Sequence, residues 1–157
     1  MTIVRPANVF GPYDNFDFKT GMVIPSLVNK FSNFKNKKIS IWGDGKNIRD
    51  FVYSKDVAKA MIFVMYKSPK FPVNIGSGKG ITIKSLVKKI SNVYGNKKNI
   101  YWDKTKIGGD KRRILNINKL KKLGFKNNYS FDEALKETIN WYKINSKKKI
   151  SKYNAFN

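Results

Sequence analysis

Hydrophobic residues along the chain alternate between short β-branched runs and longer stretches with helical spacing. The runs at 2–4, 39–42, 50–53 and 71–75 predict strands, with a further short one near 100–102. In the stretches between them, apolar residues recur three or four positions apart, as in Val23, Ile24, Leu27, Val28 and Phe31, which predicts helices. Strands that alternate with about five helices indicate an α/β fold class.

Local signals mark where several of these elements begin and end. Thr82 is a predicted N-cap, and Ser130 with Glu133 forms a capping-box pattern that predicts the start of the last helix. Gly124 is expected to end a short helix that begins near Asn116 or Asn118. The Pro-, Asn- and Gly-rich residues 6–12 predict a loop, and residues 43–45 (Gly-Asp-Gly) predict a turn.

Composition narrows the possible chemistry. The chain has 157 residues, which suits one domain or a large piece of one, and it contains neither Cys nor His. Disulfides, thiolate nucleophiles, His-based triads and His- or Cys-ligated metals are therefore excluded, and no metal site is expected. No apolar run approaches the length of a membrane span, and the first residues lack the build of a signal peptide. A cytoplasmic location is the default expectation.

The net charge of +23 invites a nucleic-acid-binding interpretation. However, 29 of the 33 cationic residues are Lys, scattered among apolar helix positions, and 18 residues are Asn. A bias toward A/T-rich codons produces this composition, so a genomic origin of the charge is favoured over a partner-driven one. Nucleic acid is therefore an unlikely partner, although a basic nucleic-acid-binding module remains the alternative function.

Two familiar patterns fail on spacing. The loop at 76–80 (Gly-Ser-Gly-Lys-Gly) lacks the glycines that a P-loop or a dinucleotide fingerprint requires, so a structural turn is predicted. Tyr66/Lys70 and Tyr94/Lys98 have the spacing of a Tyr-Lys proton-transfer pair. Pro69 and Gly95 break the helix that each pair would need, and both pairs are rejected.

The four arginines are more informative than the lysines. They are Arg5, Arg49, Arg112 and Arg113, and all lie at strand-like segments close to turns. A guanidinium makes bidentate contacts to phosphate or carboxylate that Lys cannot replace, so phosphate recognition is predicted for Arg49 and Arg112. A buried salt bridge, for example between Arg49 and a nearby Asp, is the alternative. If the hypothesis holds, the two side chains converge on one diphosphate.

Two other residues strengthen this hypothesis without deciding it. Trp42 stands seven positions before Arg49 across the predicted turn, where its ring could stack on a base or pack in the core. Asn8 follows a strand and precedes a Gly-Pro turn, where its amide could contact a ligand or cap the turn.

An ordered series of motifs resembles the C-terminal half of extended short-chain dehydrogenases/reductases, the NAD(P)-dependent sugar-nucleotide epimerase/dehydratase family. The series runs from about residue 2 to 143, and within the family it is most similar to the GDP-L-fucose synthase group. Its segments are Arg-Pro-Ala-Asn-Val-Phe-Gly-Pro (5–12), Val-Ile-Pro (23–25), Trp-Gly-Asp-Gly (42–45), Arg-Asp-Phe-Val-Tyr (49–53), Asn-Ile-Gly-Ser-Gly (74–78) and Gly-Asp-Lys-Arg-Arg (109–113).

The resemblance implies roles for particular positions. Pro6, Ala7, Asn8 and Val9 match a segment beside the nicotinamide of NAD or NADP. Contacts to a nucleotide-diphosphate sugar fall on Asn8, Lys30, Trp42, Arg49 and Arg112. The implied fold is the C-terminal part of a Rossmann-type enzyme, mostly its small substrate-binding subdomain, with residues 1–145 as that portion and 146–157 as a basic polar tail.

Two departures from the family pattern qualify these expectations. Met22 occupies the position of a His that acts in epimerisation in the GDP-L-fucose synthase group. The family's Gly-rich cofactor loop and Tyr-x-x-x-Lys pair precede the region that this sequence matches, so no catalytic residue is assigned. The chain alone is expected to be inactive. Its possible partners are a chain that supplies the missing Rossmann half, or a second copy in a homodimer. A non-catalytic scaffold is a further alternative for its function.

Overall fold

The computed structural model describes residues 2–17, 19–33, 38–95, 100–106 and 109–146. This part of the chain forms five helices and eight short strands. In order they are β1 (Val4–Pro6), β2 (Asn8–Phe10), α1 (Val23–Asn33), β3 (Ile39–Trp42), β4 (Ile48–Tyr53), α2 (Ser54–Lys67), β5 (Val73–Ile75), β6 (Gly80–Thr82), α3 (Ile83–Val93), β7 (Ile100–Asp103), β8 (Arg112–Arg113), α4 (Asn118–Lys122) and α5 (Phe131–Asn145).

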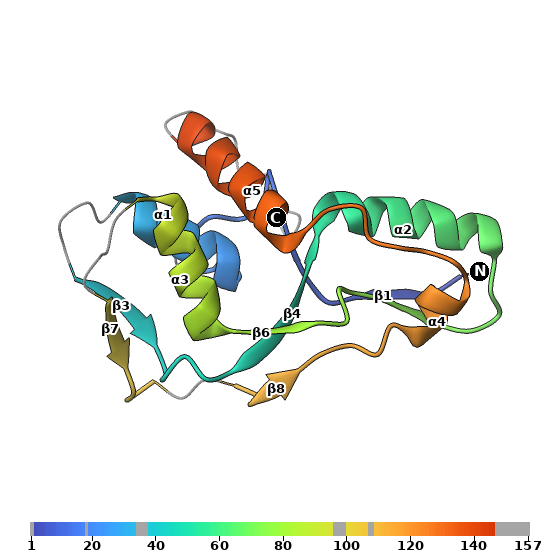
Figure 1. The fold of residues 1–157 in the computed structure, drawn as a ribbon, viewed down its shortest axis with the longest axis horizontal. Helices are drawn as coiled ribbons and strands as arrows, with labels where there is room; N and C mark the ends of the chain where they lie inside the picture. The colour runs from blue at the N-terminus through green and yellow to red at the C-terminus, as the bar shows by residue number, and fades with distance from the viewer. Residues whose placement is uncertain (1, 18, 34–37, 96–99, 107–108, 147–157) are drawn as a thin grey trace.

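The molecule is elongated, and β4 runs through its middle (Figure 1). One end holds α1, α3, β3 and β7, while the other holds α2, β1 and α4. The strands form three small sheets. β1 pairs with β5 and β3 pairs with β7, both in parallel, and β4 pairs with β2, β6 and β8. β4 is therefore the element through which the two ends of the molecule are connected.

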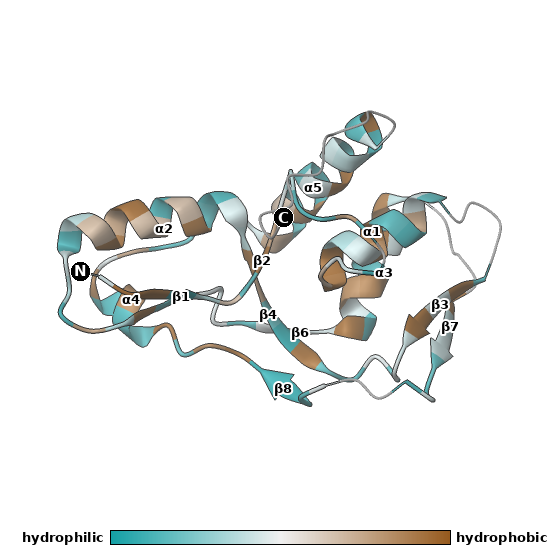
Figure 2. Cartoon of the chain, turned by 180° about the vertical axis from the view of Figure 1, so that it is seen from behind, coloured by the Kyte–Doolittle hydropathy of each residue, from teal (hydrophilic) through white to brown (hydrophobic). Residues whose placement is uncertain are grey.

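A larger hydrophobic cluster fills the end built around α1, α3 and α5. Apolar side chains from these three helices meet Phe51 and Tyr53 of β4, and Phe10 of β2 packs edge-on against Phe51. Helical spacing explains this arrangement, because residues 24, 27, 28 and 31 place one stripe of α1 in the core. In Figure 2, hydrophobic and hydrophilic residues alternate along these helices.

A smaller cluster occupies the other end, between α2, β5 and the start of α4. Val57, Ala60 and Val64 of α2 pack there with Val73 and Ile75 of β5. On β4, Val52 belongs to this cluster whereas Phe51 belongs to the larger one. Alternate residues of one strand thus serve opposite cores, as the pleat of a strand requires.

The signals for helix ends agree with the structure. The Thr82 side chain accepts a hydrogen bond from the Ser85 amide, and Ser130 and Glu133 form the predicted capping box. Gly45 lies in the predicted turn with a φ of +76°, and a Cβ there would lie 2.6 Å from the Trp102 ring. Glycine is therefore required at this position both by the backbone conformation and by the close aromatic ring.

Two predictions about loops are wrong. Residues 8–10, expected to be loop, form β2 and pair with residues 51–53 of β4. Gly80 was expected to end the turn at 76–80, but it begins β6 (Gly80–Thr82), which pairs antiparallel with β4. Both are three-residue strands whose partners lie far away in the sequence. Of the predicted tail at 146–157, Ser146 is the C-cap of α5, and residues 147–157 lie outside the described residues.

Within the described ranges, no helix is both long and apolar enough to span a bilayer. The same residues contain no group of three or more carboxylate, Cys or His side chains that could hold a metal ion.

Candidate functional site

Arg49 lies on β4 and is held against the segment that leads into β8. Its Nη1 donates to the carbonyl oxygens of Ile48, at 2.9 Å, and Asp110, at 2.6 Å. Both acceptors are neutral carbonyls, and none of the ion pairs among the described residues includes Arg49. The salt bridge with a nearby Asp that was the alternative for this residue is therefore wrong. The guanidinium keeps its charge uncompensated and its remaining N–H donors available.

The pairing of β4 with β8 decides which second arginine shares a face with Arg49. Arg113 is the partner of Arg49 across this parallel ladder, whereas Arg112 is the partner of Ile48. Paired residues project to the same face of a sheet and neighbouring residues to opposite faces. Arg113 therefore accompanies Arg49, and Arg112 projects to the face of Ile48. The expected convergence of Arg49 with Arg112 is not what the structure contains.

A buried carboxylate lies immediately beside Arg49. Asp50 is only 1% exposed, and its side chain accepts hydrogen bonds from four donors without a cation among them. Oδ1 accepts from the backbone amide of Ser77 (2.9 Å) and from its hydroxyl, and Oδ2 accepts from the amides of Gly78 (3.2 Å) and Leu115 (3.3 Å). One side chain thus joins β4 to the loop after β5 and to the segment after β8.

The same contacts explain the loop at 76–80. Its amides do point toward an anion, but the anion is the internal carboxylate of Asp50. The loop also passes so close that a Cβ on Gly76 would lie 2.7 Å from Asp50 Oδ2. These amides are consequently not available to a phosphate, which agrees with the structural turn predicted for this loop.

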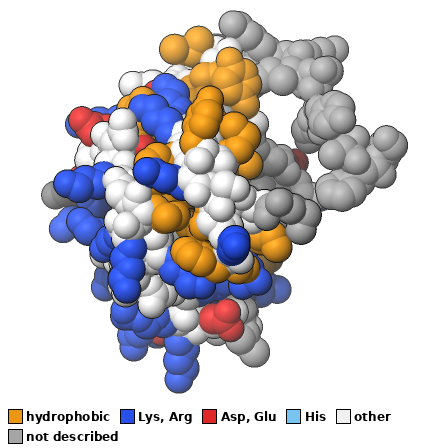
Figure 3. All heavy atoms as spheres, turned by 90° about the vertical axis from the view of Figure 1, so that its right-hand side faces the viewer, with side chains coloured by type: hydrophobic (Ala, Val, Ile, Leu, Met, Phe, Trp, Pro, Cys, Tyr) orange, Lys and Arg blue, Asp and Glu red, His pale blue; other side chains and the backbone are white. Residues whose placement is uncertain are grey.

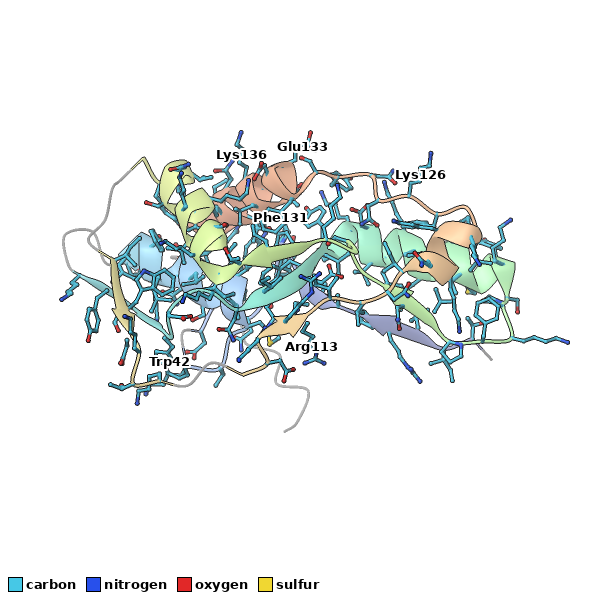
Figure 4. The ribbon with its side chains drawn as sticks, turned by 60° about the horizontal axis from the view of Figure 1, so that its bottom comes forward. Trp42, Arg113, Lys126, Phe131, Glu133 and Lys136 are labelled. Atoms are coloured by element: carbon cyan, nitrogen blue, oxygen red, sulfur yellow. The ribbon has the colours of Figure 1, made fainter. Side chains whose placement is uncertain are left out.

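Trp42 lies at the end of β3 and is 68% exposed. Alternate residues of β3 are buried, and Trp42 falls on the exposed face. Trp102 on the neighbouring β7 packs against the larger cluster instead, so core packing is not the role of Trp42. In Figure 4, Trp42 and Arg113 both lie along the lower edge, on the side away from α5. An exposed aromatic ring on the same edge as Arg113 is available to stack on a flat ligand.

Lys30 lies on α1 and contacts the same strand as Trp42. Its Nζ donates to the carbonyl oxygen of Ser40 at 3.1 Å. Partial burial lowers the pKa of the Lys30 ammonium because the charged form is less well solvated there. A bound anion near this nitrogen would favour the charged form and oppose that shift.

The segment from Pro6 to Val9 connects β1 to β2 and is fixed on both sides. The Ala7 amide donates to the carbonyl oxygen of Ile75 at 2.8 Å. The Asn8 side-chain amide donates to the backbone carbonyl of Asp50 at 2.7 Å. Asn8 thereby fixes β2 to β4, so part of its hydrogen-bonding capacity serves the fold.

Tyr53, Lys55 and Glu137 form a second cluster of ionisable groups. Lys55 Nζ lies 2.5 Å from Glu137 Oε1, an ion pair between α2 and α5. Burial, reinforced by the Glu137 carboxylate, raises the pKa of Tyr53 to about 12. A tyrosine that exchanges protons near neutral pH needs its pKa lowered, and the shift of Tyr53 runs in the opposite direction.

Two hollows of the described surface lie elsewhere. A groove of about 760 Å³ runs between β6, α4 and the segment before α5, and a smaller one of about 300 Å³ includes Arg5 and Asn74. None of the residues predicted to contact substrate or cofactor lines either hollow.

Comparison with known proteins places this fold and these motifs in one family. The model of the NAD dependent epimerase/dehydratase family matches residues 1–76. The probable GDP-L-fucose synthase 1 of Oryza sativa is 35% identical over 141 residues, which cover 87% of this chain and 43% of the rice protein. Over residues 1–76 the chain is therefore similar to the NAD dependent epimerase/dehydratase family.

Solved structures of enzymes with similar sequences share this fold. A GDP-L-fucose synthetase from Naegleria fowleri bound to NADP matches with a TM-score of 0.87 at 28% identity, covering 94% of this chain and 48% of that one. A UDP-glucose 4-epimerase from Thermotoga maritima with UDP-glucose matches with a TM-score of 0.81 at 30% identity, covering 91% and 46%. The chain thus spans less than half the length of the relatives it matches, and its fold is that of their Rossmann-type family.

The sequence analysis missed two residues of the candidate site, Arg113 and Asp50. Arg113 was noted as an arginine, but Arg112 was chosen, because register cannot be read from two adjacent arginines. Asp50 was noted only as the start of a strand. A carboxylate followed by Phe51, Val52 and Tyr53 in an apolar strand was the available signal, since a buried charge needs several hydrogen-bond partners.

Proposed function

We propose that this chain is the substrate-binding half of an NAD(P)-dependent nucleotide-sugar epimerase, dehydratase or reductase. Its role is to bind the diphosphate of a nucleotide sugar. The observation that carries this proposal is the pairing of Arg49 with Arg113 on one face of the β4–β8 ladder. No ion pair found within the described ranges involves either arginine. Two guanidinium groups on one face, without a carboxylate to neutralise them, suit two adjacent phosphate groups.

The surrounding residues supply the remaining contacts in this proposal. Trp42 stacks on the base, and Lys30 adds a cation close to β3. Arg112 was predicted to contact the nucleotide diphosphate. Because it lies on the opposite face of β8, it is a weaker candidate for this contact than Arg113. Asn8 contacts the substrate only with the hydrogen-bonding groups that its contact to Asp50 leaves free.

NAD or NADP is the cofactor of the family, and an NADP-bound relative shares this fold. The Ser77 and Gly78 amides of the Gly-rich turn are taken by Asp50, and the candidate cofactor contact is the segment Pro6, Ala7, Asn8 and Val9. The bound cofactor supplies hydride transfer, while these four residues would form one wall beside its nicotinamide.

This half positions a substrate but lacks an assigned acid/base pair. Holding the diphosphate fixes the sugar relative to the Pro6–Val9 segment, which is an orientation effect. We therefore infer that turnover requires the remainder of the family fold, supplied by a further segment or chain, and that the residues described here have no activity alone. A homodimer is the second possibility for the partner.

Calorimetric titration of the chain with GDP, and separately with UDP, tests the proposed function. We expect saturable 1:1 binding of at least one of the two, because the arginine pair recognises the diphosphate in both. A single-stranded polynucleotide is the control, titrated at about 50 and 200 mM salt. Tight polynucleotide binding that falls steeply with salt, together with no binding of GDP or UDP, would contradict the proposal and favour the nucleic-acid-binding alternative.

A further inference from the structure

The larger groove, of about 760 Å³, has an apolar floor to which both hydrophobic clusters contribute. Its apolar lining residues come from the larger cluster (Phe51, Ile81 and Phe131) and from the smaller one (Ile117, Leu120 and Phe125). The floor therefore lies where the two clusters meet at the surface. A concave site of this volume with a mostly apolar lining is typical of places where proteins bind a ligand or the side chains of a partner.

The rim of the same groove is basic. Lys79, Lys89, Lys121 and Lys126 line it from four different segments, and no Asp or Glu is among the described residues that do so. Lys89 is paired with Asp132, but the ion pairs within the described ranges include none of the other three lysines. Figure 4 shows Lys126 on the segment between α4 and α5. Three ammonium groups without a carboxylate, set around an apolar floor, favour an occupant that is both acidic and apolar.

The wider surface at this end of the molecule has the same character. Figure 3 faces the end that holds α2 and α4, and it shows many basic side chains and few acidic ones around exposed hydrophobic ones. The chain as a whole carries a net charge of +23. An acidic partner is therefore attracted toward the groove before it makes contact.

The groove also exposes part of a strand edge. β6 pairs with β4 and with no other described strand. Ile48 donates its amide to the Lys111 carbonyl, on the β8 side of β4. By alternation the backbone of Arg49 faces β6, where its register partner is Ile81. The backbone groups of Gly80 then face away from β4, and because Gly80 has no side chain, its backbone is what it contributes to the groove.

An extended peptide is the occupant that uses all three features. Its backbone can bond to the edge of β6 at Gly80, as in β-strand addition. Successive side chains of an extended chain point to opposite sides, so alternate residues can be apolar and enter the floor. The residues between them can be acidic and reach the lysines of the rim.

Two other occupants suit the groove less well. A second copy of this chain carries the same charge of +23 and would be repelled. A polynucleotide would pair its phosphates with the lysines but leave the strand edge unpaired. The aliphatic Ile117 and Leu120 of the floor also offer its bases no aromatic platform to stack on.

We propose that the larger groove is a docking site for an extended, acidic segment of a partner protein. Carboxylates of the segment pair with Lys79, Lys121 and Lys126, and its apolar side chains enter the floor. None of the residues assigned to substrate or cofactor lines this groove. The inference therefore goes beyond the proposed function and does not depend on it.

Calorimetric titration of the chain with a capped nine-residue peptide of alternating Glu and Val tests the proposal. We expect saturable 1:1 binding. A peptide with Lys in place of Glu, which lacks the charge complementarity, and one with Ser in place of Val, which lacks the apolar contacts, should each bind at least tenfold more weakly. In the complex, hydrogen exchange of the Gly80 amide should slow at least tenfold, while the Ile81 amide, which faces β4, changes little.

The double variant Lys79→Glu/Lys121→Glu should weaken binding of the Glu-Val peptide more than tenfold. Both lysines are exposed, so the fold should tolerate their replacement. Lys67→Glu/Lys70→Glu is the matched control, because it changes the net charge by the same amount at two exposed lysines that do not line the groove. We expect this control to weaken binding less than threefold.

Four results would each overturn the proposal: no binding of the Glu-Val peptide by the wild-type chain, undiminished binding by the groove variant, an equal loss in the control variant, or displacement of the peptide by a single-stranded polynucleotide. Titration of the groove variant with GDP keeps the two inferences apart. Loss of peptide binding with GDP binding unchanged supports a separate docking site, whereas peptide binding by a wild-type chain that does not bind GDP refutes only the proposed function.

Discussion

Replacing Asp50 by Ala should lower the free energy of unfolding by about 3–5 kcal/mol, the largest effect on stability that we expect from a single substitution. The carboxylate is buried and accepts four hydrogen bonds, three of them from backbone amides of segments far away in the sequence. Each buried amide left unpaired costs roughly 1–3 kcal/mol. Since a domain is stable by only about 5–15 kcal/mol, this loss removes a large share of the total.

Urea unfolding followed by circular dichroism measures this effect. Asp50→Asn should also destabilise the chain, because both carboxylate oxygens accept hydrogen bonds and an amide nitrogen can replace neither. Asp44→Ala is the matched control, since the exposed Asp44 accepts one hydrogen bond from the Lys46 amide and forms a surface ion pair with the same residue. Its loss should change stability by about 1 kcal/mol or less. Equal stability of the Asp50 and Asp44 variants would show that Asp50 does not connect the three segments.

Replacing Arg49 by Ala should weaken GDP or UDP binding by ten- to a hundredfold. A hydrogen bond to a charged group contributes about 1.5–3 kcal/mol, and each 1.4 kcal/mol is a factor of ten in affinity. Arg49→Lys should recover little of the loss, because an ammonium cannot reproduce the fork of N–H donors that a guanidinium presents to phosphate. Calorimetric titration at fixed salt measures both variants.

Arg49 also holds the Asp110 carbonyl, so its loss could act by moving that segment. Asn47→Ala is the control, because the Asn47 amide donates to the carbonyls of Gly109 and Asp110, and its removal releases the segment without a change in charge. We expect Asn47→Ala to weaken binding by less than threefold. If it weakens binding as much as Arg49→Ala, the role of Arg49 is to hold the segment in place rather than to contact phosphate.

Short-range patterns in the sequence predicted the elements that depend on neighbouring residues. The stripe of α1, the Thr82 cap and the Ser130–Glu133 box each lie within a few residues of the structure they determine, and all three are present. β2 and β6 could not be found in this way. Their sequences are short and rich in turn-forming residues, and their strand conformation comes from pairing with β4.

The site shows the same division. The choice of arginine over lysine pointed to Arg49 from composition alone, because the chain otherwise uses Lys. The selection between Arg112 and Arg113 depended on register, and a slip of one residue moves a side chain to the opposite face of the sheet. Asp50 illustrates the third case, since its four donors come from segments 27 to 65 residues away.

A double-mutant cycle tests most directly whether Arg49 and Arg113 bind one diphosphate. GDP affinity is measured for Arg49→Ala, Arg113→Ala and the double variant, with Arg112→Ala and its combination with Arg49→Ala as the second cycle. We predict that Arg113→Ala weakens binding and that its effect depends on Arg49, with a coupling above about 0.5 kcal/mol, whereas Arg112→Ala adds independently. Coupling of Arg49 to Arg112, with Arg113→Ala silent, would contradict the arrangement on which the proposed function depends.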